Sequence, residues 1–415
     1  MPLKKSTLLN LGLAAFSVTV VIVMTAVADR VFGTMQPKPE LPVAAELAFP
    51  PHSEHAYRTH DFEYTVRINA HGIRERDLPV HGPDAYRVVV VGDSFTYGWG
   101  VNAEDTWVRR LEENLRAKGY DVEVLNLGKP GAGPDFYASL AREAIPVLRP
   151  DLVVVGMLQN NDLASANPEG LSQLGDHALR PVRWLYPNTI RWLAERALPE
   201  DDERTSLDMP PQVTNAENNQ QWTRTTAQHF LDAMSEEERA RYDGLDPVAR
   251  AAFEDGLLNP FMVDLAIKNP RFYVHMLEPD AQWIQDAIQR TGLYLHEIGQ
   301  VAATYGARTV VVSVPDGPYV NREAWENIQR VGYEVEPEAL TSAALDDAIA
   351  AASARARLPF LTVTDQFRAE IDTPGLFFEL DGHLSADGHR LYGDLITPLL
   401  EPFAAQAPRL KGANS

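Results

Sequence analysis

Cysteine is absent from this chain of 415 residues. Its absence excludes a disulfide framework and a lipid-modified cysteine as a membrane anchor. It also leaves the redox compartment open, because no thiol or disulfide reports on it. Repeats with a period of about 20 to 50 residues are missing too, which excludes solenoid and propeller architectures.

Positive charge is scarce. The sequence holds 37 lysines and arginines against 58 aspartates and glutamates, for a formal net charge of -21. Binding to nucleic acid or to an anionic membrane surface needs clustered basic side chains, so neither is expected as the main ligand. The sequence has no Gly-x-x-x-x-Gly-Lys loop and no convincing group of histidines and carboxylates at metal-ligand spacing. No nucleotide, metal or other cofactor is therefore expected.

One long hydrophobic run stands at the amino terminus. Lys4 and Lys5 precede Leu8 to Ala28, which contains no charged side chain. As a helix at about 1.5 Å per residue, this run is roughly 32 Å long and predicts a single membrane span. The lysines predict a cytoplasmic amino terminus and an exported remainder.

A cleaved signal peptide is the alternative, since Ala26-Val27-Ala28 has the form of a cleavage site. The apolar run is longer than a usual signal core, which favours the anchor. We therefore expect residues 1–28 to be a transmembrane anchor or a signal peptide. The soluble part is expected in the cell envelope, on the periplasmic side of an inner-membrane anchor, or secreted if the leader is cleaved.

Residues 29–85 are interpreted as a linker followed by a β extension. After a proline-rich spacer, apolar residues at positions 62, 64, 66 and 68 alternate as in a half-buried strand, and a turn comes next at Asn69 to Gly72. From residue 86 onward, strands alternate with helical stretches, which predicts a three-layer α/β domain with a mainly parallel sheet and right-handed crossovers. The expected strands are Arg87–Val91, Val122–Asn126, Leu152–Gly156, Arg308–Val314 and Phe360–Thr364.

The interval from residue 164 to residue 285 breaks this rhythm. It is polar and acidic but carries helical stretches, so we interpret it as a mostly helical insertion, a lid over the carboxyl edge of the sheet. The α/β domain then comprises residues 86–163 and 286–405, and residues 406–415 form a tail.

A run of four valines leads directly into Gly92-Asp93-Ser94, within the stretch RVVVVGDSFTYGWGV. Such a density of β-branched residues is typical of a strand covered on both faces. In an open parallel sheet, the carboxyl end of such a strand opens onto the ligand crevice. Ser94 is therefore expected at the edge of a binding site.

Further reactive residues stand after other strands. Gly131 lies in a glycine-rich segment after the second strand, Asn161 comes after the third, and Asp381-Gly382-His383 lies near the carboxyl terminus. Because parallel strands end at one edge of the sheet, these groups are expected to converge. The set suits acyl transfer, in which His383 accepts the proton of the Ser94 hydroxyl and Asp381 orients the imidazole. Candidate oxyanion donors are the Ser94 N–H, the Gly131 N–H and the Asn161 side chain.

These blocks, in this order, resemble the SGNH (GDSL-type) hydrolase superfamily: Gly-Asp-Ser at 92–94, glycine at 131, Asn-Asp at 161–162, and Asp and His at 381 and 383. The resemblance spans about residues 86 to 400, the insertion aside. It implies a flavodoxin-like α/β/α fold, with the serine beside the switch in strand order. The extended segment before the first block resembles the exported, membrane-anchored branch of that superfamily.

Two positions depart from the common pattern. The last block is Asp-x-His where many members have Asp-x-x-His, although the shorter spacing occurs in polysaccharide-modifying relatives. The third block is Asn-Asn-Asp where Gly-x-Asn-Asp is common, so Asn160 is an alternative to Asn161 as oxyanion donor. His389, in a second Asp-Gly-His, is a rival base, but we expect it one turn inside a helix that begins near Ser385.

We therefore expect a serine esterase that acts on O-acyl esters through an acyl-enzyme, with an O-acetylated glycan as the substrate that the resemblance suggests. One alternative is an O-acyltransferase for an envelope polysaccharide, which needs a separate acyl-donor protein. The other is a catalytically inactive glycan-binding or scaffold protein with the same fold. Turnover of an ester at Ser94 separates the enzymes from the binding protein.

Overall fold

A computed structural model describes residues 5–35, 47–81, 84–165, 185–186, 189 and 215–410. At its centre lies a five-stranded sheet in which all neighbouring strands are parallel. The strand order is β4-β3-β5-β6-β7, the flavodoxin-like order expected from the resemblance. The strands are β3 (Tyr86–Gly92), β4 (Val122–Gly128), β5 (Leu152–Leu158), β6 (Arg308–Val314) and β7 (Phe360–Leu361).

The first four predicted strands are confirmed, and the fifth is shorter than predicted. β7 pairs with β6 only at Phe360 and Leu361. Beyond it, the Thr362 hydroxyl bonds to Asp346 at 2.6 Å and accepts the Thr364 N–H at 3.1 Å. These side-chain bonds replace the ladder, and Thr364 instead begins the helix α16 (Thr364–Arg368).

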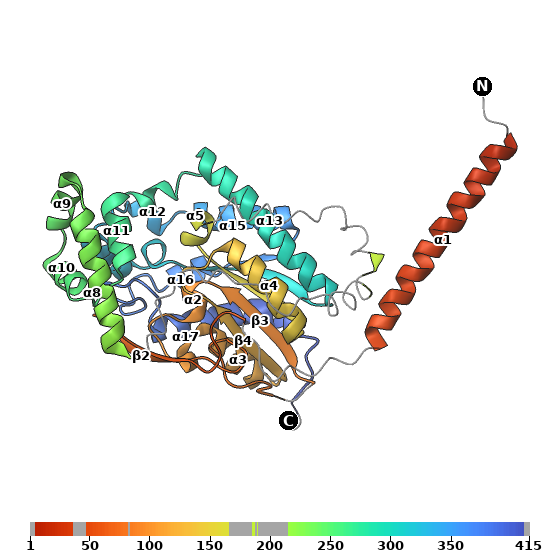
Figure 1. Cartoon of the computed structure of the whole chain (residues 1–415), viewed down its shortest axis with the longest axis horizontal. Coiled ribbons are helices and arrows are strands. Elements are labelled where there is room, and N and C mark those ends of the chain that lie inside the picture. Colours follow the sequence, from red (N-terminus) through yellow and green to blue (C-terminus); the bar gives the residue numbers. More distant parts are fainter. Residues whose placement is uncertain are drawn as a thin grey trace.

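Helices cover both faces of the sheet, which confirms the three-layer prediction (Figure 1). α3 (Trp107–Ala117) packs against α17 (Ala386–Ala404), whereas α13 (Gln282–Thr304) packs against α4 (Pro134–Leu148) and α15 (Ala344–Ala356). With right-handed crossovers, the strand order places α3 on one face and the crossover helices α4, α13 and α15 on the other. Every residue of β3, β4 and β5 is buried between these layers.

The predicted β extension is a two-stranded antiparallel hairpin of β1 (Glu54–Arg58) and β2 (Glu63–Arg67). Tyr64, Val66 and Ile68 are buried and pack in one cluster with Tyr97. The alternating pattern of the sequence therefore marks the face that rests on the α/β domain.

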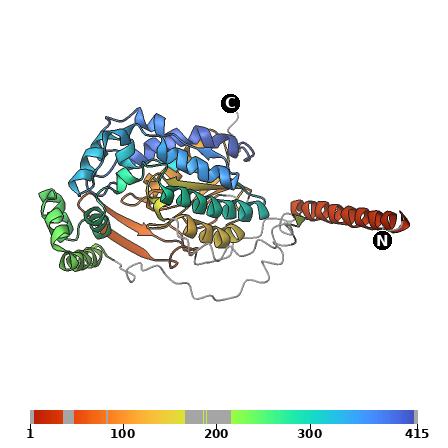
Figure 2. The same ribbon diagram turned by 90° about the horizontal axis from the view of Figure 1, so that it is seen from above.

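The described part of the predicted insertion is helical and lies at one end of the molecule (Figure 2). Its helices have their own apolar core, which they share with Ile328 of α14 (Arg322–Arg330). Polar residues cap four of these helices at their amino ends, as sequence rules favour. The helices are α8 (Ala216–Ala233), α9 (Glu236–Asp243), α10 (Pro247–Glu254), α11 (Pro260–Lys268) and α12 (Phe272–His275). The predicted domain boundaries stay a prediction, and residues 166–184, 187–188 and 190–214 of the predicted insertion lie outside the described residues.

At the amino terminus, α1 (Lys5–Met35) is a helix that projects from the rest of the chain (Figure 1). Among the described residues, no helix combines the length and apolar character needed to cross a membrane. The predicted membrane anchor therefore has no support from the structure.

Candidate active site

A row of glycines underlies the segment that carries the predicted nucleophile. Gly92 of β3 is in register with Gly128 of β4 and Gly156 of β5. A Cβ at Gly128 would stand only 2.1 Å from the backbone nitrogen of Tyr97. The absence of side chains here lets the short helix α2 (Ser94–Tyr97) lie directly on the carboxyl edge of the sheet.

Asp93 fixes the start of α2. Its Oδ1 accepts the Phe95 N–H at 2.9 Å, the bond of a helix N-cap. Asp93 is fully buried, and burial raises its pKa to about 6 against the opposing charge of His383. The serine next to it is thus held at the first position of a capped helix.

Ser94, His383 and Asp381 form one hydrogen-bonded chain. The Nε2 of His383 lies 2.8 Å from the Ser94 Oγ, and its Nδ1 lies 2.5 Å from the Asp381 Oδ1. The side chain of His383 is 16% exposed and that of Asp381 only 3%. The structure therefore brings together the three residues that the sequence singles out, in the predicted order.

A tight loop makes the short Asp-x-His spacing possible. Phe377 and Leu384 form an antiparallel bridge, and inside it the Phe378 N–H donates to the carbonyl of His383 at 2.8 Å. Gly382 at the tip has a φ of +79°, in the left-handed region that favours glycine. This turn brings the side chains on either side of Gly382 into contact.

The environment of His383 makes it a stronger base. Burial acts to lower the pKa of the imidazole, but the Asp381 carboxylate, with smaller contributions from Asp93 and Asp316, raises the pKa above its ordinary value of 6.5. A proton taken from Ser94 is therefore held more firmly than by an isolated histidine.

Ser94 and His383 line a cavity of about 300 Å³. Two helices of the predicted insertion, α11 and α12, form part of its wall. They and the residue before α11 contribute Asn259, Phe261, Met262, Leu265, Phe272 and Tyr273. The cavity is therefore built jointly by the sheet edge, the Asp381 loop and the insertion.

The predicted oxyanion donors share this cavity with the serine. Gly131 is exposed, has a φ of +74° and has no atom within 4 Å of where its Cβ would stand. Asn161 is half-buried and begins α5 (Asn161–Ser165), whereas Asn160 is only 2% exposed. Both asparagines line the cavity.

Asp162, the next residue, has a structural role. Its carboxylate accepts the Tyr137 hydroxyl and the Leu158 N–H, both at 2.8 Å. Burial, with the charge of Asp93, raises the pKa of Asp162 well above its ordinary value. These bonds fix the loop in which the two asparagines stand.

Sequence reasoning misses Asp316, which also lines the cavity. Burial raises the pKa of Asp316 to about 7, against the opposing effect of the Asn160 side chain. The residue lies just beyond β6, at the same edge of the sheet as Ser94. Its sequence signal is its place just after the strand Arg308–Val314, as Ser94 follows the first predicted strand.

The rival base His389 lies within α17, as expected. Its ring is buried, and its Nδ1 accepts the backbone N–H of Trp107 at 3.3 Å. Burial lowers the pKa of His389 to about 3. A ring held in this way is part of the packing between α17 and α3.

Residues 90–276 match the model of the GDSL-like Lipase/Acylhydrolase family. The chain carries a GDSL-like lipase/acylhydrolase domain. The matched segment contains Ser94, Gly131 and Asn161, and the structure adds Asp381 and His383 from beyond it.

Individual proteins also resemble this part of the chain. Esterase TesA of Pseudomonas aeruginosa is 33% identical over 93 residues, which cover 21% of this chain and 44% of that esterase, less than half of its length. The crystal structure of TesA matches with a TM-score of 0.35 and 12% identity, covering 76% of this chain and 99% of TesA. A lipase/acylhydrolase from Enterococcus faecalis matches with a TM-score of 0.35 and 13% identity, covering 78% and 98% of the two chains.

Proposed function

We propose that this protein is a serine esterase that cleaves O-acyl esters through an acyl-enzyme on Ser94. The hydrogen-bonded chain from Ser94 through His383 to Asp381 is the observation that carries the proposal. His383 takes the hydroxyl proton as the Ser94 Oγ attacks the ester carbonyl, and returns it to the leaving alcohol. Water, activated by the same imidazole, then hydrolyses the acyl-enzyme.

Three donors are assigned to the oxyanion that forms at the carbonyl. They are the Ser94 N–H at the start of α2, the Gly131 N–H and the Asn161 side chain, and each such donor is worth about 10² to 10³ in rate. The side chain of Asn160 is engaged in a hydrogen bond with the buried Asp316, which acts to lower the pKa of that carboxyl. We therefore assign the oxyanion role to Asn161 rather than to Asn160.

The cavity supports a substrate with apolar or ring-shaped surface next to the ester. Phe261, Phe272 and Tyr273 line it together with Ser94, and aromatic faces suit both hydrocarbon and the faces of sugar rings. An O-acetylated glycan is our proposed substrate, in keeping with the short Asp-x-His spacing that occurs in polysaccharide-modifying relatives.

Labelling with a fluorophosphonate tests the nucleophile. We expect one label on Ser94 by mass spectrometry, and loss of both labelling and aryl acetate turnover in Ser94→Ala and His383→Ala. Ser53→Ala, which removes a hydroxyl that donates to the nearby Pro50 carbonyl, is the matched control and keeps full activity. Unlabelled, folded protein that still binds glycan would favour the inactive binding protein over the esterase.

An O-acyltransferase is the second candidate, because the insertion helices α11 and α12 form part of the wall of the cavity at Ser94, and exclusion of water from such a cavity favours transfer over hydrolysis. The same acyl-enzyme then passes its acyl group to a sugar hydroxyl, and a separate protein supplies the acyl donor. Product analysis with an acylated donor and a free oligosaccharide distinguishes the two activities. Acylated sugar in place of free acid would identify the transferase.

Export to the cell envelope is a further part of the proposal. It is supported by Lys4 and Lys5 and by the uncharged run after them, which ends at Ala28. Cell fractionation, with the mass of the amino-terminal peptide of the mature protein, tests both export and cleavage. Full-length protein in the cytoplasm would refute it.

A further inference from the structure

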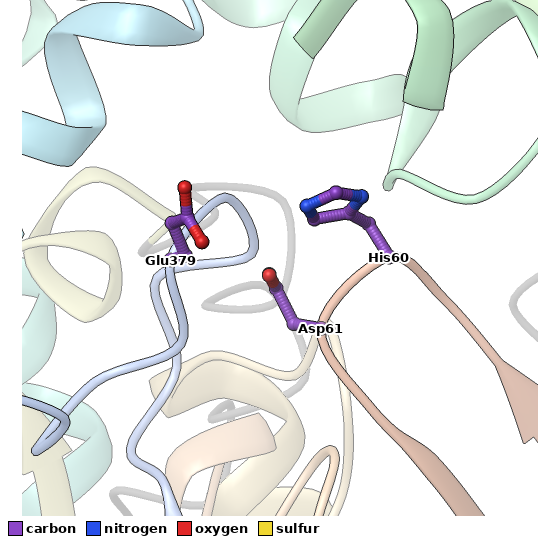
Figure 3. Close-up of side chains that lie close together, drawn as sticks. All are labelled: His60, Asp61 and Glu379. Carbon is purple, nitrogen blue, oxygen red and sulfur yellow. The ribbon is translucent and has the colours of Figure 1, made fainter. Parts of the chain in front are cut away.

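The hairpin that precedes the matched segment reaches the loop of the candidate triad. Asp61 stands between β1 and β2, and its Oδ2 accepts two backbone N–H groups, from Leu380 at 2.9 Å and from Asp381 at 2.7 Å. Figure 3 shows the Asp61 side chain directed at the loop that carries Glu379. The Asp61 carboxylate of the hairpin thus binds the backbone of Asp381, the residue that orients His383.

Aromatic contacts also join the hairpin to the Asp381 loop. Phe62, next to Asp61, packs on Phe378 with 4.7 Å between ring centroids. Phe62 also meets Trp99, whose indole N–H donates to the Asp381 Oδ2 at 3.3 Å. Asp381 is therefore held at two points. Its backbone N–H is bound by Asp61, and its carboxylate is bound by Trp99.

The same extension fixes the segment that carries Trp99. The buried guanidinium of Arg74 donates to the carbonyls of Tyr97 at 2.9 Å, Gly98 at 2.7 Å and Val101 at 2.5 Å. These are charge-assisted bonds to the turn that ends α2. Residues 54–76 therefore contact both the Asp381 loop and the turn that ends α2, the helix that begins with Ser94.

A cation site is the competing interpretation of this region. Ligand atoms of His60, Asp61 and Glu379 all lie within 4.8 Å of one another (Figure 3). Both carboxylates, however, are already engaged: Asp61 accepts the two N–H groups of the loop, and Glu379 is paired with the guanidinium of Arg330. The existing bonds account for the cluster without a metal.

We propose that Asp61 is a positioning residue, whose carboxylate holds the loop so that Asp381 stays within hydrogen-bond distance of His383. Gly382, at the tip, has the conformational freedom that makes such an external tether useful. The kinetic consequence rests on the proposed esterase function, whereas the structural consequence for His383 does not.

Three variants of the full chain test the proposal by kinetics. Asp61→Ala removes the acceptor, and we expect kcat to fall by about 10²-fold with KM changed less than about threefold, because misplaced groups slow the chemical step. Asp61→Asn keeps an oxygen that accepts the same N–H groups, and we expect it to restore kcat to within about threefold. Glu63→Ala removes an exposed carboxylate of the same hairpin, paired with Arg58, and leaves kcat unchanged.

A titration of the imidazole by NMR provides a readout that needs no turnover. Asp381 raises the pKa of His383, so loosening their contact in Asp61→Ala lowers that pKa, and Asp61→Asn keeps it. This shift in a protein without esterase activity would support the positioning role while refuting the proposed function. An unchanged His383 pKa in Asp61→Ala, an equal loss of kcat in Glu63→Ala, or activity lost with a chelator and restored by Zn²⁺ would each overturn the proposal.

Discussion

The chain contains the tripeptide Asp-Gly-His twice, at 381–383 and at 387–389, and the two copies have different fates. The first forms a tight loop with a φ of +79° at its glycine. The second lies in the first turn of α17, which begins after the Ser385 cap. The same three residues thus adopt two different backbone conformations.

The surroundings of the two histidines diverge accordingly. His383 contacts Ser94 and Asp381, and its pKa is raised. His389 is buried against the Trp107 N–H, and its pKa is lowered to about 3. The comparison teaches that the loop backbone, rather than the tripeptide, creates the candidate base.

Replacing each histidine in turn tests which of the two Asp-Gly-His copies provides the base, and it has the largest expected effect. We expect His383→Gln to lower kcat/KM by about 10⁴- to 10⁶-fold, because Ser94 loses its base. We expect His389→Gln to keep kcat in the folded protein, since its ring serves packing. Initial rates on an aryl acetate, normalised to folded protein by circular dichroism, provide the measurement. Comparable losses in the two variants would contradict the assignment.

The aspartates give the next largest contrast. Asp381→Asn keeps the shape of the side chain but favours the wrong tautomer of His383, and we expect kcat to fall by about 10⁴-fold. Asp387 is exposed and pairs with Arg390 on the surface, a type of ion pair worth about 0 to 1 kcal/mol. Asp387→Asn should therefore change neither kcat nor the unfolding midpoint measurably. A large loss in Asp387→Asn alone would reverse the roles of the two copies.

Much of the α/β framework is predictable because its signals are local. The valine run before Gly92 marks a strand covered on both faces, and glycines at the ends of neighbouring strands mark the edge on which α2 rests. The strand order is implied by the resemblance, and that order in turn puts Ser94 and Asn161 at one edge. The same rule, applied to the end of β6, finds Asp316.

The hydrogen bonds between Asp61 and the Asp381 loop are not predictable in this way. Asp61 lies 320 residues before Asp381 and in the sequence is only a polar residue in a turn. Its partners are backbone N–H groups, which carry no side-chain signature. The early end of the predicted strand Phe360–Thr364 is missed for a related reason, because it depends on side-chain bonds of the Thr362 hydroxyl to Asp346 and to the Thr364 N–H.

The pH dependence of kcat/KM distinguishes the two histidines, with a smaller expected effect than the substitutions above. The reaction needs neutral His383, whose pKa lies above 6.5, so kcat/KM falls about tenfold per pH unit below a midpoint above pH 6.5. His389, with a pKa of about 3, stays neutral throughout that range and does not contribute to this fall. A pH–rate profile of His389→Gln should therefore keep the midpoint of the parent protein. A shifted midpoint would place His389 in the reaction.

Stability responds to the two rings with opposite signs. The folded-state pKa of His389 lies below its unfolded value, so its contribution to stability is complete above pH 6.5 and is lost as the pH falls. The loss is at most about 1.4 kcal/mol per pH unit. The raised pKa of His383 acts in the other direction, since its contribution is complete below pH 6.5 and is lost as the pH rises through the folded-state value. Denaturant unfolding at pH 5 and 6.5 should show a shallower decline for His389→Gln, and an unaltered decline would contradict the burial of a neutral ring.

The glycines provide the finest contrast, because alanine meets different obstacles in the two copies. At Gly382 a Cβ has room, with its nearest neighbour, the Ile328 Cδ1, at 3.9 Å, but the φ of +79° costs an alanine about 1–2 kcal/mol. At Gly388 a Cβ would stand 2.0 Å from the Leu376 carbonyl oxygen, so alanine forces the start of α17 apart. We expect Gly382→Ala to reduce kcat about tenfold through loss of loop geometry, and Gly388→Ala to lower the unfolding midpoint while the folded fraction keeps its kcat. A kcat defect confined to Gly388→Ala would mean that the packing of α17, rather than the turn at Gly382, sets the alignment of His383 with Ser94.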